Sequence, residues 1–164
     1  MDSLHHGYKL RQGRCSQPHQ HYLITGVTRN RIPWFENTDR ARLLSRNFLN
    51  LDQQGACMSL CFVVMPDHFH WLLVLSNKHS LSQTVGMLKS QTARAIGQSI
   101  WQRGFHDHAL RQEEDALQIA RYIVANPLRA GLVKSVRDYP YWYAIWLEGH
   151  ILIVGASLAA RFHT

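Results

Sequence analysis

Residues 64–75 read VMPDHFHWLLVL and place two histidines, two positions apart, at the start of an apolar run. The MPD segment predicts a turn between strands over residues 58–64 and 68–75, which would form a hairpin. Because side chains alternate along a strand, His68 and His70 share a face with residues 72 and 74. Residues 69, 71, 73 and 75 occupy the other face. Both faces are largely apolar, so we expect a central strand covered on both sides.

The two histidines of this strand need partners, because burying unpaired polar groups is costly. Histidines on one face, about 6 to 7 Å apart along a strand, can converge on one divalent cation. Alternatively, His68 and His70 are core residues hydrogen-bonded to the backbone. The strand by itself leaves both interpretations open.

The remaining sequence predicts further strands over residues 21–28 and 105–111. Predicted helices begin near residues 37–38, 80–82 and 113–115 and end near Leu51, Ile100 and Ala125, the last before Pro127. The order β-α-β-β-α-β plus a helix is typical of a ferredoxin-like fold. We therefore expect an α+β fold with an antiparallel sheet. The aromatic residues 139–143 and the apolar residues 151–160 have no predicted place in it.

Charge and composition indicate a globular protein with a polyanionic partner. Eighteen Lys and Arg oppose eleven Asp and Glu, giving a net charge of +7. This excess favours nucleic acid first and an anionic membrane surface second. Three cysteines without a CxxC pair argue against a disulfide framework. Because no apolar run is long enough to cross a bilayer and no signal-peptide core is present, we expect a soluble intracellular protein.

The segment RYIVANPLRAGLV, residues 121–133, carries a second candidate constellation. Tyr122 and Asn126 are four residues apart and so share a helix face, although Pro127 distorts that turn. The phenol is a candidate nucleophile, and the amide oxygen is a candidate third metal ligand. Alternatively, Tyr122 is a core residue beside Ile119 and Ile123 with its hydroxyl in water, and Asn126 ends the helix.

Taken together, VVMPDHFHWLLV at residues 63–74 and YIVANPLRAGLV at residues 122–133 resemble the REP-associated tyrosine transposases. These belong to the single-tyrosine HUH transposases, where HUH means His-hydrophobic-His. Further matches are YLITGVTR from Tyr22, WQRGFHDHALR from Trp101 and DYPYW from Asp138, and the resemblance extends from about Tyr22 to Trp146. We accordingly interpret residues 21–147 as the transposase domain, residues 1–20 as an N-terminal arm and residues 148–164 as an apolar C-terminal tail. The long arm and the apolar tail depart from the family pattern.

The resemblance implies a metal-dependent endonuclease that cleaves and rejoins hairpin-containing single-stranded DNA through a 5′-phosphotyrosine intermediate. By position, Tyr122 would be the nucleophile, and His68, His70 and Asn126 would hold Mg²⁺ or Mn²⁺. The expected partner is single-stranded or hairpin DNA of REP elements, bound by a cytoplasmic, nucleoid-associated monomer or homodimer. Alternative functions are a non-catalytic hairpin-binding protein of the same fold and an unrelated His-metal hydrolase in which Tyr122 is dispensable.

Basic and aromatic residues suited to phosphates and bases accompany these motifs. The predicted DNA contacts are Arg29, Arg31, Trp34, Lys89, Arg94, Arg103, Arg121 and Arg129. For each arginine the alternative is a solvated surface role. A second alternating pair, His106 and His108, is expected to line the site without binding the metal.

Overall fold

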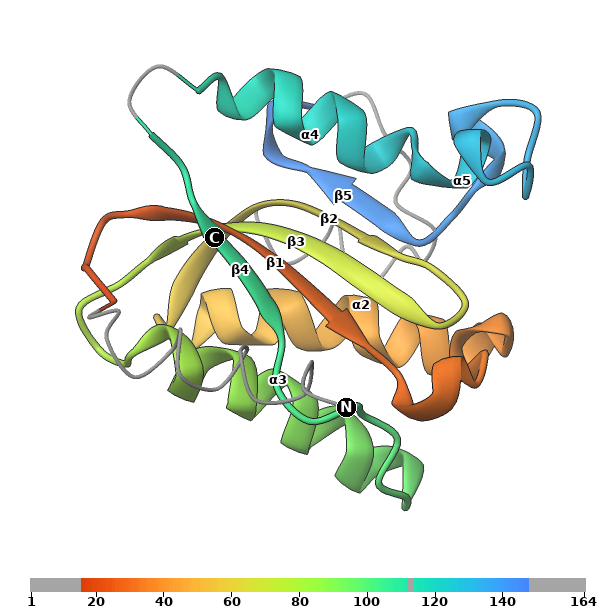
Figure 1. Ribbon diagram of the computed structural model, residues 1–164, viewed down its shortest axis with the longest axis horizontal. Helices are drawn as coiled ribbons and strands as arrows, with labels where there is room; N and C mark the ends of the chain where they lie inside the picture. The colour runs from red at the N-terminus through yellow and green to blue at the C-terminus, as the bar shows by residue number, and fades with distance from the viewer. Residues whose placement is uncertain (1–15, 112–113, 148–164) are drawn as a thin grey trace, which may run out of the picture.

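The computed structural model describes residues 16–111 and 114–147, which form a five-stranded antiparallel sheet in the order β4-β1-β3-β2-β5 (Figure 1). The strands are β1 (His21–Val27), β2 (Cys57–Val64), β3 (His68–Leu75), β4 (His106–Ala109) and β5 (Trp142–Ala144). The helices are α2 (Thr38–Gln53), α3 (Leu81–Ile96), α4 (Ala116–Val124) and α5 (Asn126–Arg129). Strands β1 to β4, with α2 and α3, follow the expected ferredoxin-like order, which confirms the α+β fold. Strand β5 was not predicted.

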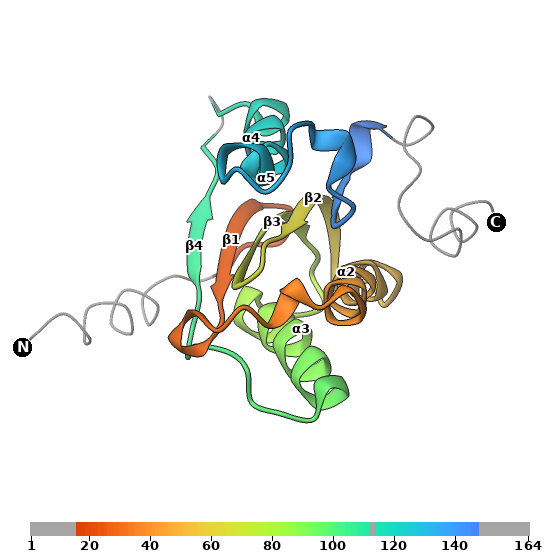
Figure 2. The same ribbon diagram turned by 90° about the vertical axis from the view of Figure 1, so that its right-hand side faces the viewer.

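Helices cover both faces of the sheet, with α2 and α3 on one side and α4 on the other (Figure 2). The central strand β3 pairs with β1 and β2. Phe69 and Trp71 are buried against α2 and α3, whereas Leu72 packs in the cluster beneath α4. The predicted division of the two faces is thus confirmed. The expectation that both faces of β3 are fully covered is wrong at the start of the strand, because His68 and His70 are only half buried there.

Local caps explain where the helices begin and end. The Asn37 side chain accepts a hydrogen bond from the backbone of Arg40, and Ser80 forms a capping box with Gln83. Helix α3 ends at Gly97, whose φ of 86° is left-handed, and so stops short of the predicted Ile100. Helix α4 ends at Val124 with Ala125 as its C-cap, which confirms the predicted end before Pro127, and Pro127 lies in the first turn of the short helix α5 that follows.

A buried polar chain attaches β3 to β2 and α2. Trp71 Nε1 donates to Ser59 Oγ over 2.8 Å, and Ser59 donates through both N and Oγ to Asp52 Oδ1 over 3.0 and 2.8 Å. Burial raises the pKa of Asp52 to about 6, against the opposing effect of these hydrogen bonds. The chain meets β2 where its register with β3 shifts between Ser59 and Cys61. It therefore fixes the strand that carries the two histidines.

Gly26 of β1 pairs with Phe69 of β3, and a Cβ atom at this position would overlap the fully buried Phe69 ring. We expect Gly26→Ala to lower the free energy of unfolding by about 1 to 3 kcal/mol, because the ring has no space into which to move. Urea denaturation measures this change.

Gly86→Ala is the matched control for that substitution. Gly86 lies inside α3, and an added Cβ meets nothing within 4 Å. Helix propensity then predicts a gain of about 0.5 to 1 kcal/mol. If Gly26→Ala unfolded at the same urea concentration as the wild-type protein, the close approach of Phe69 would be refuted.

The predicted domain boundaries fall partly outside the described residues. Strand β1 begins at His21, the expected start of the domain, whereas most of the N-terminal arm and all of the C-terminal tail (residues 1–15 and 148–164) are not described. The arm and the tail thus stay predictions. In the part of the chain that the structure describes, no helix combines the length and apolar character needed to cross a bilayer.

Candidate functional site

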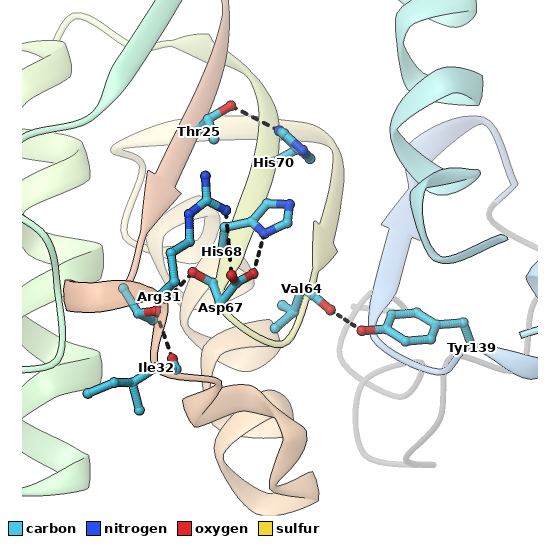
Figure 3. Close-up of polar contacts among 9 residues, drawn as sticks. Thr25, Arg31, Ile32, Val64, Asp67, His68, His70 and Tyr139 are labelled. Atoms are coloured by element: carbon cyan, nitrogen blue, oxygen red, sulfur yellow. Dashed lines mark hydrogen bonds and ion pairs between the residues drawn. The ribbon is translucent and has the colours of Figure 1, made fainter. Parts of the chain in front are cut away.

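His68 and His70 lie at the start of β3 with their ring centroids 5.0 Å apart. Nδ1 of His68 donates to Asp67 Oδ1 over 2.7 Å, and Nδ1 of His70 pairs with Thr25 Oγ1 over 2.9 Å (Figure 3). Within the described residues, neither Nε2 atom makes a hydrogen bond. The interpretation as core histidines bonded to the backbone is therefore wrong. Imidazoles held through one nitrogen, with the other nitrogen available, are the arrangement that metal-binding histidines use.

The electrostatics of the pair suit a cation. Burial lowers the pKa of His70 to about 4, and the charges of His68 and Arg129 contribute to the shift. His70 is therefore neutral near pH 7, which is the form that binds metals. Partial burial acts to raise the pKa of Asp67, but the hydrogen bond and charge of His68 and the charge of Arg31 hold it below its usual range. Asp67 thus stays a carboxylate.

Asp67 connects the histidine pair to the turn after β1. Its carboxylate lies 3.5 Å from Arg31 Nη1, and its backbone carbonyl accepts from both N and Oγ1 of the fully buried Thr28 (Figure 3 shows the carboxylate contacts). Asn30 and Arg31 have φ angles of 56° and 55°, a left-handed conformation that is uncommon for residues other than glycine. This turn directs the Arg31 guanidinium toward the carboxylate that holds His68.

Tyr122 lies on α4 with 65% of its surface exposed, more than any other described tyrosine. Its neighbour Ile123 is buried, so the helix turns the phenol outward and the interpretation of Tyr122 as a core residue is wrong. The guanidinium of Arg129 lies over the ring, with Cζ 3.7 Å from the centroid. Tyr139 shows the contrast, because it is buried, donates to the carbonyl of Val64 and has a raised pKa due to burial (Figure 3). Of the two, Tyr122 is the one accessible to a substrate.

Asn126 opens α5 and is half buried. Its side-chain Nδ2 donates to the carbonyl of Ile123 over 3.2 Å, and its side-chain Oδ1 makes no hydrogen bond within the described residues. No group of three or more His, Cys, Asp or Glu side chains in the described chain could hold a metal ion. A cation bound by His68 and His70 would therefore need oxygen ligands, for which the Asn126 carbonyl, water and phosphate have the right chemistry. The residues present fit Mg²⁺ or Mn²⁺ with open coordination positions.

The predicted DNA contacts separate into two groups. Arg31 and Arg129 lie at the histidine pair, since Arg31 contacts Asp67 and the charge of Arg129 acts on His70. Arg29 and Trp34 belong to the 3₁₀ helices that follow β1 (Arg29–Arg31 and Trp34–Glu36), where Arg29 donates to Ser99 Oγ. Arg31 and Arg129 therefore form the basic surroundings of the histidine pair.

In the second group, two residues lie across the sheet from the histidine pair and two are exposed on other elements. Lys89 and Arg94 lie on α3, which packs on the opposite face of the sheet, and the Lys89 ammonium donates to the carbonyls of Gln102 and Gly104. Arg103 is exposed in the loop before β4, and Arg121 is exposed on α4. A DNA contact at any of these four positions stays a prediction.

Two residues of the site, Thr25 and Asp67, were not predicted. Asp67 directly precedes His68, a position that could have drawn attention to it. Thr25 lies opposite His70 in the pairing of β1 with β3. The local sequence of either strand does not determine this register. Thr25 also pairs with His106 on β4, which places His106 and, two positions on, His108 on the same sheet face as His70. The imidazole of His108 is bonded to Glu114.

Sequence comparisons identify relatives of the chain. The family model described as "Transposase IS200 like" matches residues 16–126, which include His68, His70, Tyr122 and Asn126. A putative REP-associated tyrosine transposase of Haemophilus influenzae is 29% identical over 99 residues, covering 51% of this chain and 56% of that protein. The REP-associated tyrosine transposase of Escherichia coli is 35% identical over 82 residues, covering 49% and 50%. The chain thus spans about half the length of the curated relatives it matches.

Solved structures agree with this assignment. A REP-associated tyrosine transposase bound to a REP hairpin superposes with a TM-score of 0.69 at 27% identity, covering 79% of both chains. A putative transposase from Deinococcus radiodurans shares the fold, with a TM-score of 0.50 at 22% identity over 68% of this chain and 93% of that one. These similarities confirm the resemblance to the REP-associated branch. Since the family model matches more than half of its length, the chain belongs to the family of IS200-like transposases.

Proposed function

We propose that this protein is a metal-dependent single-strand DNA endonuclease and strand transferase that forms a covalent link to DNA through Tyr122. The observation that carries the proposal is the geometry of the histidine pair. Both imidazoles are fixed through Nδ1 by Asp67 and Thr25 and keep Nε2 available, while the charge of Arg129 acts on His70 and its guanidinium stacks on the exposed Tyr122. The Arg129 side chain thus contacts the candidate nucleophile and acts electrostatically on a candidate metal ligand.

In the proposed reaction, the Tyr122 oxygen loses its proton and attacks the phosphorus of the scissile phosphodiester. The bond from phosphorus to the 3′ oxygen breaks, and that oxygen takes up a proton to become a free 3′-hydroxyl. The product is a 5′-phosphotyrosine diester, which conserves the energy of the broken bond, so the reverse attack rejoins strands. A divalent cation held by His68, His70 and Asn126 would polarise a phosphate oxygen and offset the charge of the transition state.

Other residues of the site have supporting roles in this proposal. Asp67 and Thr25 orient the imidazoles, as outer partners of metal ligands do. Arg31 and Arg129 would offset phosphate charge on either side of the pair, with Arg29 and Trp34 extending the path of the strand.

The substrate we propose is hairpin-containing single-stranded DNA of repeated extragenic elements. The related transposase solved with a REP hairpin supports this substrate. The net charge of +7 supports a polyanionic partner. In this proposal, the protein acts on nucleoid DNA in the cytoplasm as a monomer or a homodimer.

A labelling experiment tests the proposed chemistry and its polarity. Hairpins with single-stranded flanks, selected for retention by the protein, carry a fluorophore at either the 5′ or the 3′ end. With Mg²⁺ or Mn²⁺ we expect a denaturation-resistant adduct that keeps the 3′ label, while the 5′-labelled fragment is released with a 3′-hydroxyl. Retention without cleavage in either metal would indicate a non-catalytic binding protein. Cleavage without an adduct would indicate a hydrolase that does not use Tyr122.

A further inference from the structure

The contact between Arg129 and Tyr122 is the tightest cation–ring contact among those described. The Arg129 Cζ lies 3.7 Å from the Tyr122 ring centroid, against 4.9 Å for Arg40 over Trp34 and 5.7 Å for the Lys89 ammonium over Trp101. Both Tyr122 and Arg129 are exposed, so core packing does not force them together. A guanidinium over the face of an exposed ring favours that ring orientation over others.

The backbone between the two residues explains how they meet. They are seven residues apart, which is two helical turns and returns to the same face. The path stays hydrogen-bonded across the α4–α5 junction, since Ala125 N donates to Arg121 O over 3.2 Å and Arg129 N donates to Ala125 O over 3.0 Å. Pro127 is buried at this junction. Arg129 therefore meets Tyr122 because the hydrogen-bonded helical backbone continues past Pro127.

Stacking uses the flat face of a guanidinium and leaves its N–H groups able to donate to phosphate oxygens. A lysine ammonium has no flat face and cannot combine the two roles. Arg129 can thus hold the phenol through its flat face and still donate to a phosphate.

We propose that Arg129 is a positioning residue that holds the Tyr122 ring in the orientation needed for attack at the histidine pair. This inference rests on the proposed function and goes beyond a DNA contact, because it assigns the arginine an effect on the nucleophile before DNA is bound. After transfer, the same N–H groups lie beside the phosphotyrosine diester. An arginine that served as a phosphate contact alone would affect hairpin affinity and leave the orientation of the phenol unchanged.

Single-turnover cleavage at saturating hairpin and metal separates the two roles. For Arg129→Ala we expect the saturating rate to fall roughly 10- to 100-fold, the scale of a misplaced reacting group. Arg129→Lys restores hairpin affinity through its charge but leaves the rate low. Arg46→Ala, an exposed arginine of α2 on the other side of the sheet, is the matched control and cuts at the wild-type rate. Weaker hairpin binding by Arg129→Ala with an unchanged saturating rate would overturn the proposal.

A second measurement needs neither DNA nor metal. In protein labelled with 3-fluorotyrosine, the ¹⁹F resonance of Tyr122 is assigned by its loss in Tyr122→Phe. Arg129→Ala and Arg129→Lys are expected to shift this resonance, and Arg46→Ala to leave it in place. An unshifted resonance in Arg129→Ala would overturn the stacking. If the wild-type protein cut no selected hairpin, the proposed function would fail, and the fluorine shift would still decide separately whether Arg129 holds the ring.

Discussion

Tyr122→Phe protein is expected to bind a DNA hairpin like the wild-type protein and to form no covalent adduct with it. The substitution removes the attacking oxygen and keeps the ring, and with it the contact of Arg129 with the ring face. Loss of a nucleophile typically lowers turnover by about 10³-fold or more. Denaturing gels with 3′-labelled hairpin measure the adduct, and gel retardation without metal measures binding. Because 65% of the Tyr122 surface is exposed, we expect little change in the free energy of unfolding.

Tyr141→Phe is the control for this experiment. The Tyr141 hydroxyl bonds to Thr38 Oγ1 over 3.2 Å, away from the histidine pair, so its loss leaves the adduct unchanged. An undiminished adduct in Tyr122→Phe would show that another group attacks the phosphate. Loss of the adduct in both variants would point to a general disturbance of the domain.

Removal of the metal is expected to have the second-largest effect. Chelation with EDTA stops cleavage by the wild-type protein, and added Mn²⁺ or Mg²⁺ restores it. His68→Ala and His70→Ala each lose roughly 10²- to 10³-fold in rate at saturating metal, because a bound cation typically contributes several kcal/mol of transition-state stabilisation. Isothermal titration with Mn²⁺ measures the metal affinity directly, independent of any cleavage.

His108→Ala serves as the control for the histidine variants. Its imidazole lies on the edge strand β4 and is already bonded to Glu114, so we expect wild-type cleavage and metal affinity. Full cleavage by His68→Ala with metal present, or undiminished cleavage in EDTA, would refute the metal role of the pair.

Much of the fold could be predicted from the sequence, because alternation and capping are local signals. Residues 21–28 and 68–75 alternate as strands do, and Asn37 and Ser80 are good helix caps. Strand β5 could not be predicted in this way, since its three residues are too few to show a period. Its existence depends on pairing with β2, where Val63 faces Trp142 across a separation of 79 positions in the chain.

The site was predictable where it depends on neighbours in sequence and not where it depends on the assembled sheet. The common face of His68 and His70 follows from strand geometry, and the helical turn of Tyr122 and Asn126 follows from their spacing. The partnership of His70 with Thr25 joins two strands and needs the register between them. Whether Lys89 and Arg94 lie near the histidine pair depends on which sheet face α3 covers. Their charge alone could therefore not show that they lie away from the pair.

The central place of β3 has an evolutionary consequence. The strand is bonded on both edges, and its two histidines follow directly after the β2–β3 turn. Substitutions can tune the neighbours of this site one at a time, but the loss or gain of a single codon in the strand would exchange its two faces. Phe69 and Trp71 would then replace the imidazoles at the surface, and the imidazoles would enter the apolar core. We expect natural variants of this chain to tolerate length changes in loops distant from this hairpin and to exclude them between Val64 and Leu75.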